Sequence, residues 1–346
     1  LLMKYKNLFF DLDDTLIGSD GKIAPANFCA LEQLSAAGVT AAAVTGRTFY
    51  EMPAELRFNP LVPYAVYGDG AAAVNAAEFA AELPKGLGED CLVVLNSQSG
   101  TTAETVRAAQ LAKERGALTA AYTTAPESPL EQAVDFPIYY YDDPVNPYPL
   151  LLSIFPEVYQ TVFALLDVWE GTKRLPIMET AMENLEEVCG RATASFKPEA
   201  LEFAANHRTE PIIYTVSAGL DRCIAYILTN CSFMESVWRH SSPLHAGELF
   251  HGACEAIDKE TAVVAFLGIG PWRSVEERAV KFLQRVTDKL TVLDAAALDL
   301  TGIPAEVQDI VAPLVLHAIA SDYCLRLSQR LGHPMSSRRY MGVVKF

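Results

Sequence analysis

The sequence predicts an α/β fold of two doubly wound parallel-sheet units, each an α-β-α sandwich, joined by helices. Short apolar runs alternate with stretches of helical periodicity along most of the 346 residues. Strands separated by helices of roughly 10 to 15 residues imply parallel sheets covered on both faces. Between Tyr148 and His207 the pattern is helical and lacks strand signals, so this stretch divides the chain into two such units.

Nine apolar runs are the predicted strands, and one long helix closes the chain. The first half contains "NLFFDLD", "VTAAAVT", "PYAVYG", "CLVVLNS", "ALTAAYT" and "FPIYYY". After the helical stretch come "PIIYTVS", "TAVVAFLGI" and "KLTVLDA". An apolar-periodic helix is predicted over about 304–331, and Gly332 and Pro334 end it as a helix stop should.

Composition and charge narrow the classes of function. The chain is 51% apolar, which is typical of a packed globular protein of about two domains. A net charge of −16 without a long basic run argues against nucleic acid and membrane as partners. The seven cysteines lack CxxC spacing, which indicates reduced thiols and no zinc site, and no apolar run has the length of a membrane span. We therefore expect a cytoplasmic protein.

The opening stretch "FFDLDDTL" places two aspartates, Asp11 and Asp13, on one face of a predicted strand, and Thr45 ends the next strand. Residues 1–75 resemble the start of a haloacid dehalogenase superfamily phosphatase. The resemblance implies that Asp11 attacks a phosphoryl group, Asp13 shuttles the proton, Thr45 holds the phosphate and a magnesium ion offsets the charge. Phosphoryl transfer needs such a nucleophile and such a cation.

A working phosphatase site also needs a lysine and a second acidic pair. Lys85 and the pair Asp142 and Asp143 imitate these positions only weakly. Without cationic compensation Asp11 would face a dianionic phosphate unaided. We therefore favour a vestigial strand-and-turn motif in a βαβ unit, and keep a magnesium-dependent phosphatase as the alternative.

The stretch "SQSGTTAETVRAAQLAKERGA" begins with hydroxyl residues and a glycine where a predicted strand turns into a helix. Free backbone N–H groups and the positive helix end would attract a phosphate there. An ordinary serine-rich helix cap is equally consistent with these residues. The stretch resembles the phosphate loop of sugar isomerase (SIS) domains, and the resemblance runs from about Ala72 to the C-terminus. It implies that the sugar phosphate is bound by Ser97, Gln98, Ser99 and Thr102.

A second informative stretch, Met234–Asp258, contains Glu235, three histidines and Glu248, and we expect mixed helix and turn there. Glu235 and His251 are too far apart in sequence to be neighbours on one helix, so they meet by folding or across a subunit interface. A carboxylate base and an imidazole acid suit proton transfer next to a carbonyl. The histidines lack HExxH spacing, so no metal site is expected, and surface or interface roles stay open for each.

Two motifs in this stretch, "FMESVW" and "GELFHG", resemble those that hold the glutamate base and the proton-donating histidine of double-SIS enzymes. The ending "HPMSSRRYMGVVKF" resembles that of the deglycases, with Met341 where the isomerase part of glucosamine-6-phosphate synthase has a ring-opening lysine. The resemblance implies Glu235 and His251 as catalytic residues. It also implies deglycation of a ketosamine 6-phosphate to an aldose 6-phosphate and a free amine, without a metal or organic cofactor, in a homodimer or larger homo-oligomer. A non-catalytic phosphosugar sensor is a further alternative.

The expected domain organisation combines the two resemblances. A haloacid dehalogenase-like segment, 1–75, is expected to complete the first sheet. Then follow the remainder of the first SIS unit (76–150), a helical linker (151–206), the second SIS unit (207–303) and a C-terminal helix and tail (304–346).

Overall fold

The computed structural model describes the strands 7–10, 40–45 and 64–67, four residues between 30 and 36, and the segments 75–84, 87–143, 149–341 and 343–344. The chain divides into two compact units. The first comprises residues 1–91 and 103–117, and the second comprises residues 92–102 and 118–346.

Among the residues that the structure describes, the first unit holds a parallel sheet with the strand order β1-β2-β3 and the helices α3 and α4. Its elements are β1 (Asn7–Phe10), β2 (Thr40–Thr45), β3 (Tyr64–Tyr67), α3 (Ala76–Ala81) and α4 (Ala103–Glu114). The three strands match the predicted ones. The side-chain carboxamide of Asn75 caps α3 through its Oδ1, which accepts a hydrogen bond from the Ala77 amide. That this segment completes the first SIS sheet stays a prediction.

The second unit begins with a three-stranded parallel sheet, ordered β4-β5-β6. Its elements are β4 (Leu92–Asn96), β5 (Leu118–Thr123), α5 (Pro129–Ala133) and β6 (Phe136–Tyr139). All three strands were predicted. Because parallel strands end at the same edge of a sheet, the loop after β4 lies beside the end of β5, where the Ser97 amide donates to the Tyr122 carbonyl.

A four-stranded parallel sheet, ordered β10-β9-β7-β8, forms the core of the remainder. Its strands are β7 (Ile212–Ser217), β8 (His240–His245), β9 (Ala262–Leu267) and β10 (Leu290–Asp294). The expectation of mixed helix and turn was wrong for β8. Two serines and Pro243 hide its strand character, and Pro243 is tolerated because β8 is an edge strand among the described elements.

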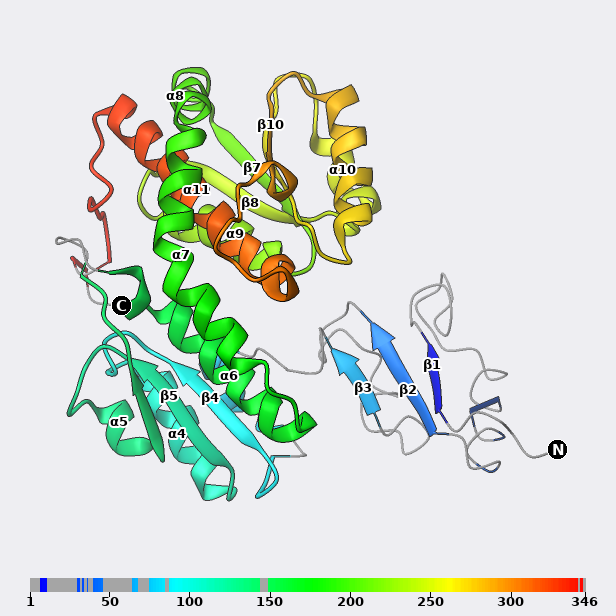
Figure 1. Ribbon diagram of the computed structural model, residues 1–346, viewed down its shortest axis with the longest axis vertical. Coiled ribbons are helices and arrows are strands. Elements are labelled where there is room, and N and C mark those ends of the chain that lie inside the picture. The colour runs from blue at the N-terminus through cyan, green and yellow to red at the C-terminus, as the bar shows by residue number, and fades with distance from the viewer. Residues whose placement is uncertain are drawn as a thin grey trace. The chain divides into compact units, whose positions relative to one another are not determined.

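Helices cover both faces of this sheet, as an α-β-α sandwich requires (Figure 1). The helices are α6 (Ile154–Glu170), α7 (Leu175–Ser195), α8 (Lys197–Asn206), α9 (Asp221–Ile227), α10 (Arg273–Val286) and α11 (Gln308–Leu331). Alternate residues of β9 face opposite cores. Val264 and Phe266 pack with α7, α8, α9 and α11, whereas Val263 and Ala265 pack with α10.

Short helical turns complete the second unit. They are η3 (Leu150–Leu152), a π-helix η4 (Leu228–Met234), η5 (Glu248–His251), η6 (Ala253–Ala256), η7 (Ala295–Ala297) and η8 (Ala305–Val307). The closing helix ends at Gly332, whose φ of 64° is left-handed, as predicted. Residues Ala305–Leu331 are long and apolar enough to cross a membrane, but 67% of their most apolar window is buried inside the protein, as in a core helix.

Candidate active site

The loop after β4 is anchored by its backbone to the end of β5. The Gln98 carbonyl accepts hydrogen bonds from the Thr123 hydroxyl (3.1 Å), the Thr124 hydroxyl (2.9 Å) and the Thr124 amide (3.1 Å). Gly100 has a φ of +61°, and its carbonyl accepts from the Leu130 amide at 3.0 Å. These bonds fix the shape of the loop before any ligand arrives.

The hydroxyl groups of the loop pair with one another. Ser97 Oγ lies 2.9 Å from Thr102 Oγ1, and Ser99 Oγ lies 2.9 Å from Thr101 Oγ1. Ser97 is buried, whereas the other three are exposed. The backbone N–H groups of Gln98 and Ser99 donate to no other described residue. The loop therefore offers an anion several hydroxyl and amide donors within a short stretch of chain.

Gln98 is the one predicted phosphate ligand whose side chain leaves the loop. Its Nε2 donates to Asp142 Oδ2 at 2.7 Å. Asp142, a weak match to a phosphatase acidic position, thus contacts the predicted phosphate loop. A bound phosphate would compete with the Asp142 carboxylate for the side-chain N–H groups of Gln98.

Glu235 lies directly after the π-helix η4, and its amide donates to the Asn230 carbonyl at 3.0 Å, which is a π-type hydrogen bond. Such wide turns are rare and occur mostly at functional sites. The Glu235 carboxylate is about one quarter exposed, and its Oε1 lies 2.6 Å from Arg338 Nη2. The predicted base is therefore accessible and held in an ion pair.

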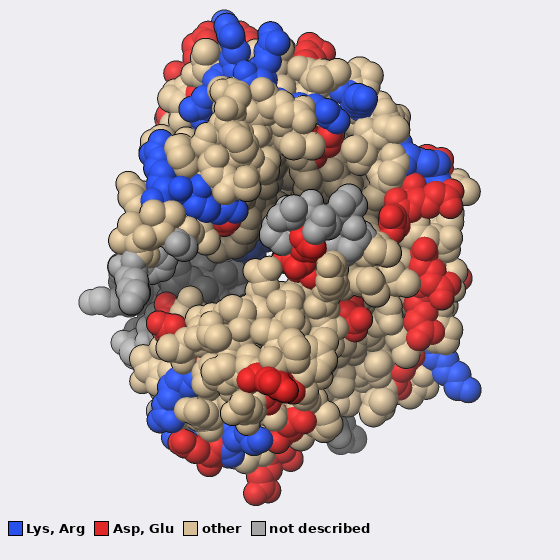
Figure 2. All heavy atoms as spheres, turned by 90° about the vertical axis from the view of Figure 1, so that its left-hand side faces the viewer, with Lys and Arg blue, Asp and Glu red and all other residues tan. Residues whose placement is uncertain are grey.

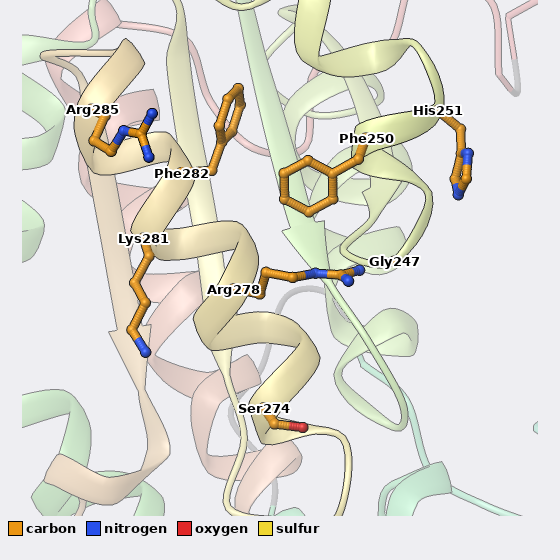
Figure 3. A pocket seen from close by; sticks show the side chains of 8 residues that line it. All are labelled: Gly247, Phe250, His251, Ser274, Arg278, Lys281, Phe282 and Arg285. Atoms are coloured by element: carbon orange, nitrogen blue, oxygen red, sulfur yellow. The ribbon is translucent and has the colours of Figure 1, made fainter.

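His251 ends η5 and lines a pocket of about 700 Å³. Arg278, Lys281 and Arg285 line the same pocket from α10, at a spacing that places them on one side of the helix. Figure 3 shows Arg278 extending from α10 below Phe250, while His251 projects on the opposite side of the opening. The Arg278 guanidinium lies 4.9 Å from the centre of the Phe250 ring.

This pocket is locally basic in an acidic protein. None of its three α10 cations forms an ion pair with an acidic residue in the described segments. Figure 2 shows a different face, the one that carries the C-terminal tail, where basic and acidic side chains form separate groups. The net charge of −16 therefore coexists with surface that favours an anion.

Within one chain, the structure joins some predicted site residues and not others. Ser97 and Thr102 are in contact, but no hydrogen bond or ion pair links Glu235 to His251 among the described residues. Asp11 and Asp13 lie outside the described residues, and Thr45 ends β2. Sequence reasoning did not identify Arg338 or the α10 cations, although the "RRYM" stretch and the spacing of 278, 281 and 285 were visible in the sequence.

Two family models match the chain. The SIS domain model matches residues 71–150, and the haloacid dehalogenase-like hydrolase model matches residues 8–85. The sequence is 39% identical to fructosamine deglycase FrlB of Bacillus subtilis over 79% of this chain and 82% of that protein. It is 28% identical to fructoselysine 6-phosphate deglycase of Escherichia coli over 83% of this chain and 79% of that protein.

The fold is similar to a solved structure of the same kind. A crystal structure described as a phosphosugar isomerase from Bacillus subtilis superposes with a TM-score of 0.75 at 37% identity, over 83% of this chain and 85% of that one. The predicted resemblance to SIS enzymes and the predicted fold class are thereby confirmed. The chain belongs to the SIS-domain family of sugar-phosphate deglycases and isomerases.

Proposed function

We propose that this protein deglycates ketosamine 6-phosphates, converting one ketosamine 6-phosphate and one water to an aldose 6-phosphate and a free amine. The observation that carries the proposal is the 39% identity to a fructosamine deglycase over 79% of the chain. The hydroxyl-rich loop, the accessible Glu235 and the pocket at His251 are consistent with it.

The proposed reaction is a proton transfer followed by hydrolysis. The loop of Ser97, Gln98, Ser99 and Thr102 holds the 6-phosphate. Glu235 takes a proton from C1, the carbon bearing nitrogen, while His251 protonates the oxygen at C2, which gives an enaminol. Return of the proton to C2 produces a C1 imine, and water adds to it and releases the amine. C1 is oxidised by as much as C2 is reduced, so the reaction requires no external oxidant or reductant.

We further propose a cytoplasmic homodimer in which Glu235 of one subunit works with His251 of the other. The exposure of His251 and the absence of a hydrogen bond or ion pair between the two residues in the described part of one chain support this arrangement. The basic side chains beside His251 would then lie near the substrate of the neighbouring subunit.

The proposal is tested by Glu235→Gln and His251→Ala. Loss of a positioned acid or base typically lowers the rate by roughly 10²- to 10⁴-fold, so each variant should lose turnover of fructoselysine 6-phosphate to that extent. Both should still bind glucose 6-phosphate in calorimetry, because neither belongs to the phosphate loop. Retention of wild-type turnover by either variant would contradict its assigned role.

Mixing the same two variants tests the shared site. A heterodimer of the variants has one site with both mutations and one site with neither, so random exchange should restore about a quarter of wild-type activity. Subunit exchange is verified with differently tagged chains. Exchange without recovered activity, or a monomer in sedimentation, would show that each chain builds its site alone.

A further inference from the structure

The C-terminal tail, residues 333–341, is held against the segment that follows the π-helix. Arg338 Nη2 lies 2.6 Å from Glu235 Oε1. Two residues of the tail also contact the Trp238 ring. The His333 ring meets it edge-on, with the two ring centres 4.2 Å apart, and the Arg339 guanidinium lies 4.0 Å from the centre of the Trp238 ring. Three contacts therefore connect the tail to a stretch of four residues that begins with the proposed base.

The position of Arg338 does not depend on Glu235 alone. Its Nη1 donates to the Met335 carbonyl at 2.8 Å and to the Ser337 carbonyl at 2.9 Å. The guanidinium is thus held by the backbone of its own tail, while its Nη2 faces the carboxylate. The side chains of Arg338 and Glu235 are 29% and 24% exposed, so water screens the pair only in part.

Trp238 shows that this region is conformationally unusual. Its φ is +59°, in the left-handed region that bulky residues rarely adopt. Such a conformation persists only where the surroundings enforce it, and it is concentrated at functional sites. Here the Arg239 amide donates to the Phe233 carbonyl at 2.8 Å, and the tail holds the Trp238 ring.

We propose that Arg338 is a positioning residue for the proton-transfer site, fixing the direction of the Glu235 carboxylate. This inference rests on the proposed function of Glu235. An arginine suits the role because its guanidinium stays protonated and so cannot take up the substrate proton in place of Glu235. The tail thereby becomes part of the site, although it is remote from Glu235 in the sequence.

The kinetic test compares Arg338→Ala, Arg338→Lys and Arg330→Ala in the full chain. A misplaced catalytic group can cost about 10²-fold, so Arg338→Ala should lower kcat for fructoselysine 6-phosphate by about that factor and change KM by less than about threefold. Arg338→Lys should recover part of the loss, because it keeps the charge but not the planar fork. Arg330→Ala is the matched control, since it removes an exposed guanidinium in the last turn of α11 that contacts neither Glu235 nor Trp238, and it should keep kcat within about threefold of wild type.

The second arm needs no substrate. Hydrogen exchange of residues 333–341 should rise in Arg338→Ala and in Glu235→Gln, and the double variant should exchange no faster than either single one. An unchanged kcat in Arg338→Ala, or an equal loss in Arg330→Ala, would overturn the inference while leaving the proposed function standing. A wild-type chain without turnover would overturn both, and the exchange data would still show whether the tail contact exists.

Discussion

At the scale of single residues, the shape of the predicted phosphate loop depends most directly on Gly100. Its φ is +61°, and a Cβ atom built there would lie 2.2 Å from Ser128 Oγ. Ser128 cannot easily give way, because its Oγ caps α5 by accepting from the Glu131 amide. Only glycine combines the left-handed backbone with this close approach.

We expect Gly100→Ala to distort the loop and weaken binding of sugar phosphates. The left-handed conformation alone costs an alanine roughly 1 to 2 kcal/mol, and the contact with Ser128 adds to this cost. Affinity for glucose 6-phosphate, measured by calorimetry, should fall by about tenfold or more. Gly190→Ala in α7 is the control, because nothing lies within 4 Å of its added methyl group. Equal affinity in Gly100→Ala and the parent would contradict the loop assignment.

The sequence predicts individual candidate site residues but not the partners that they contact. Glu235 and His251 were predicted from short motifs around them. The Glu235–Arg338 pair joins residues that are distant in the chain, and no local pattern records such a contact. The Gln98–Asp142 contact was missed for the same reason.

At the scale of elements, the burial of a strand decides whether the sequence reveals it. β9 is buried at every position, and its continuous apolar run predicted a strand. β8 is only partly buried, so polar residues and a proline are compatible with it and conceal it. The π-helix before Glu235 was not predicted from the sequence, and its residues Leu228 and Phe233 are buried in the core.

Two buried carboxyl groups lie where α9 and α10 begin. Glu276 accepts hydrogen bonds from the amides of Ala218 (2.9 Å) and Gly268 (2.8 Å), and Asp221 accepts one from the Trp272 indole at 3.2 Å. Burial raises the pKa of both groups, and the negative charge of Asp221 raises the pKa of Glu276 further. The folded protein therefore retains protons that the unfolded chain releases.

This pair predicts that stability falls as the pH rises. The stability that the two protonated carboxyl groups contribute is fully present below the pKa of a carboxyl group in the unfolded chain. It is lost as the pH rises through the raised pKa values of Asp221 and Glu276 in the folded protein. The free energy of unfolding, measured in urea between about pH 5 and pH 9, should decrease, and Asp221→Asn should flatten that decrease. Glu183→Gln, at an exposed position of α7, is the control. A slope that Asp221→Asn leaves unchanged would contradict the assignment.

At the scale of the whole molecule, the alternation of strands and helices was enough to predict the fold class. Successive residues of β9 pack into two separate cores, and each core requires its own covering helices. That requirement produces the repeating pattern visible in the sequence. The proposed dimer and its proposed shared site depend on contacts between two chains, which the pattern of strands and helices in one sequence does not record.

The central claim is the reaction itself, and one assay tests it most directly. The purified full chain is incubated with fructoselysine 6-phosphate, with magnesium in one sample and a chelator in another, and lysine, glucose 6-phosphate and inorganic phosphate are measured. We expect equal amounts of lysine and glucose 6-phosphate, no inorganic phosphate, and the same rate with the chelator. Magnesium-dependent release of inorganic phosphate that Asp11→Asn abolishes and Glu235→Gln leaves unchanged would contradict the account and favour the phosphatase.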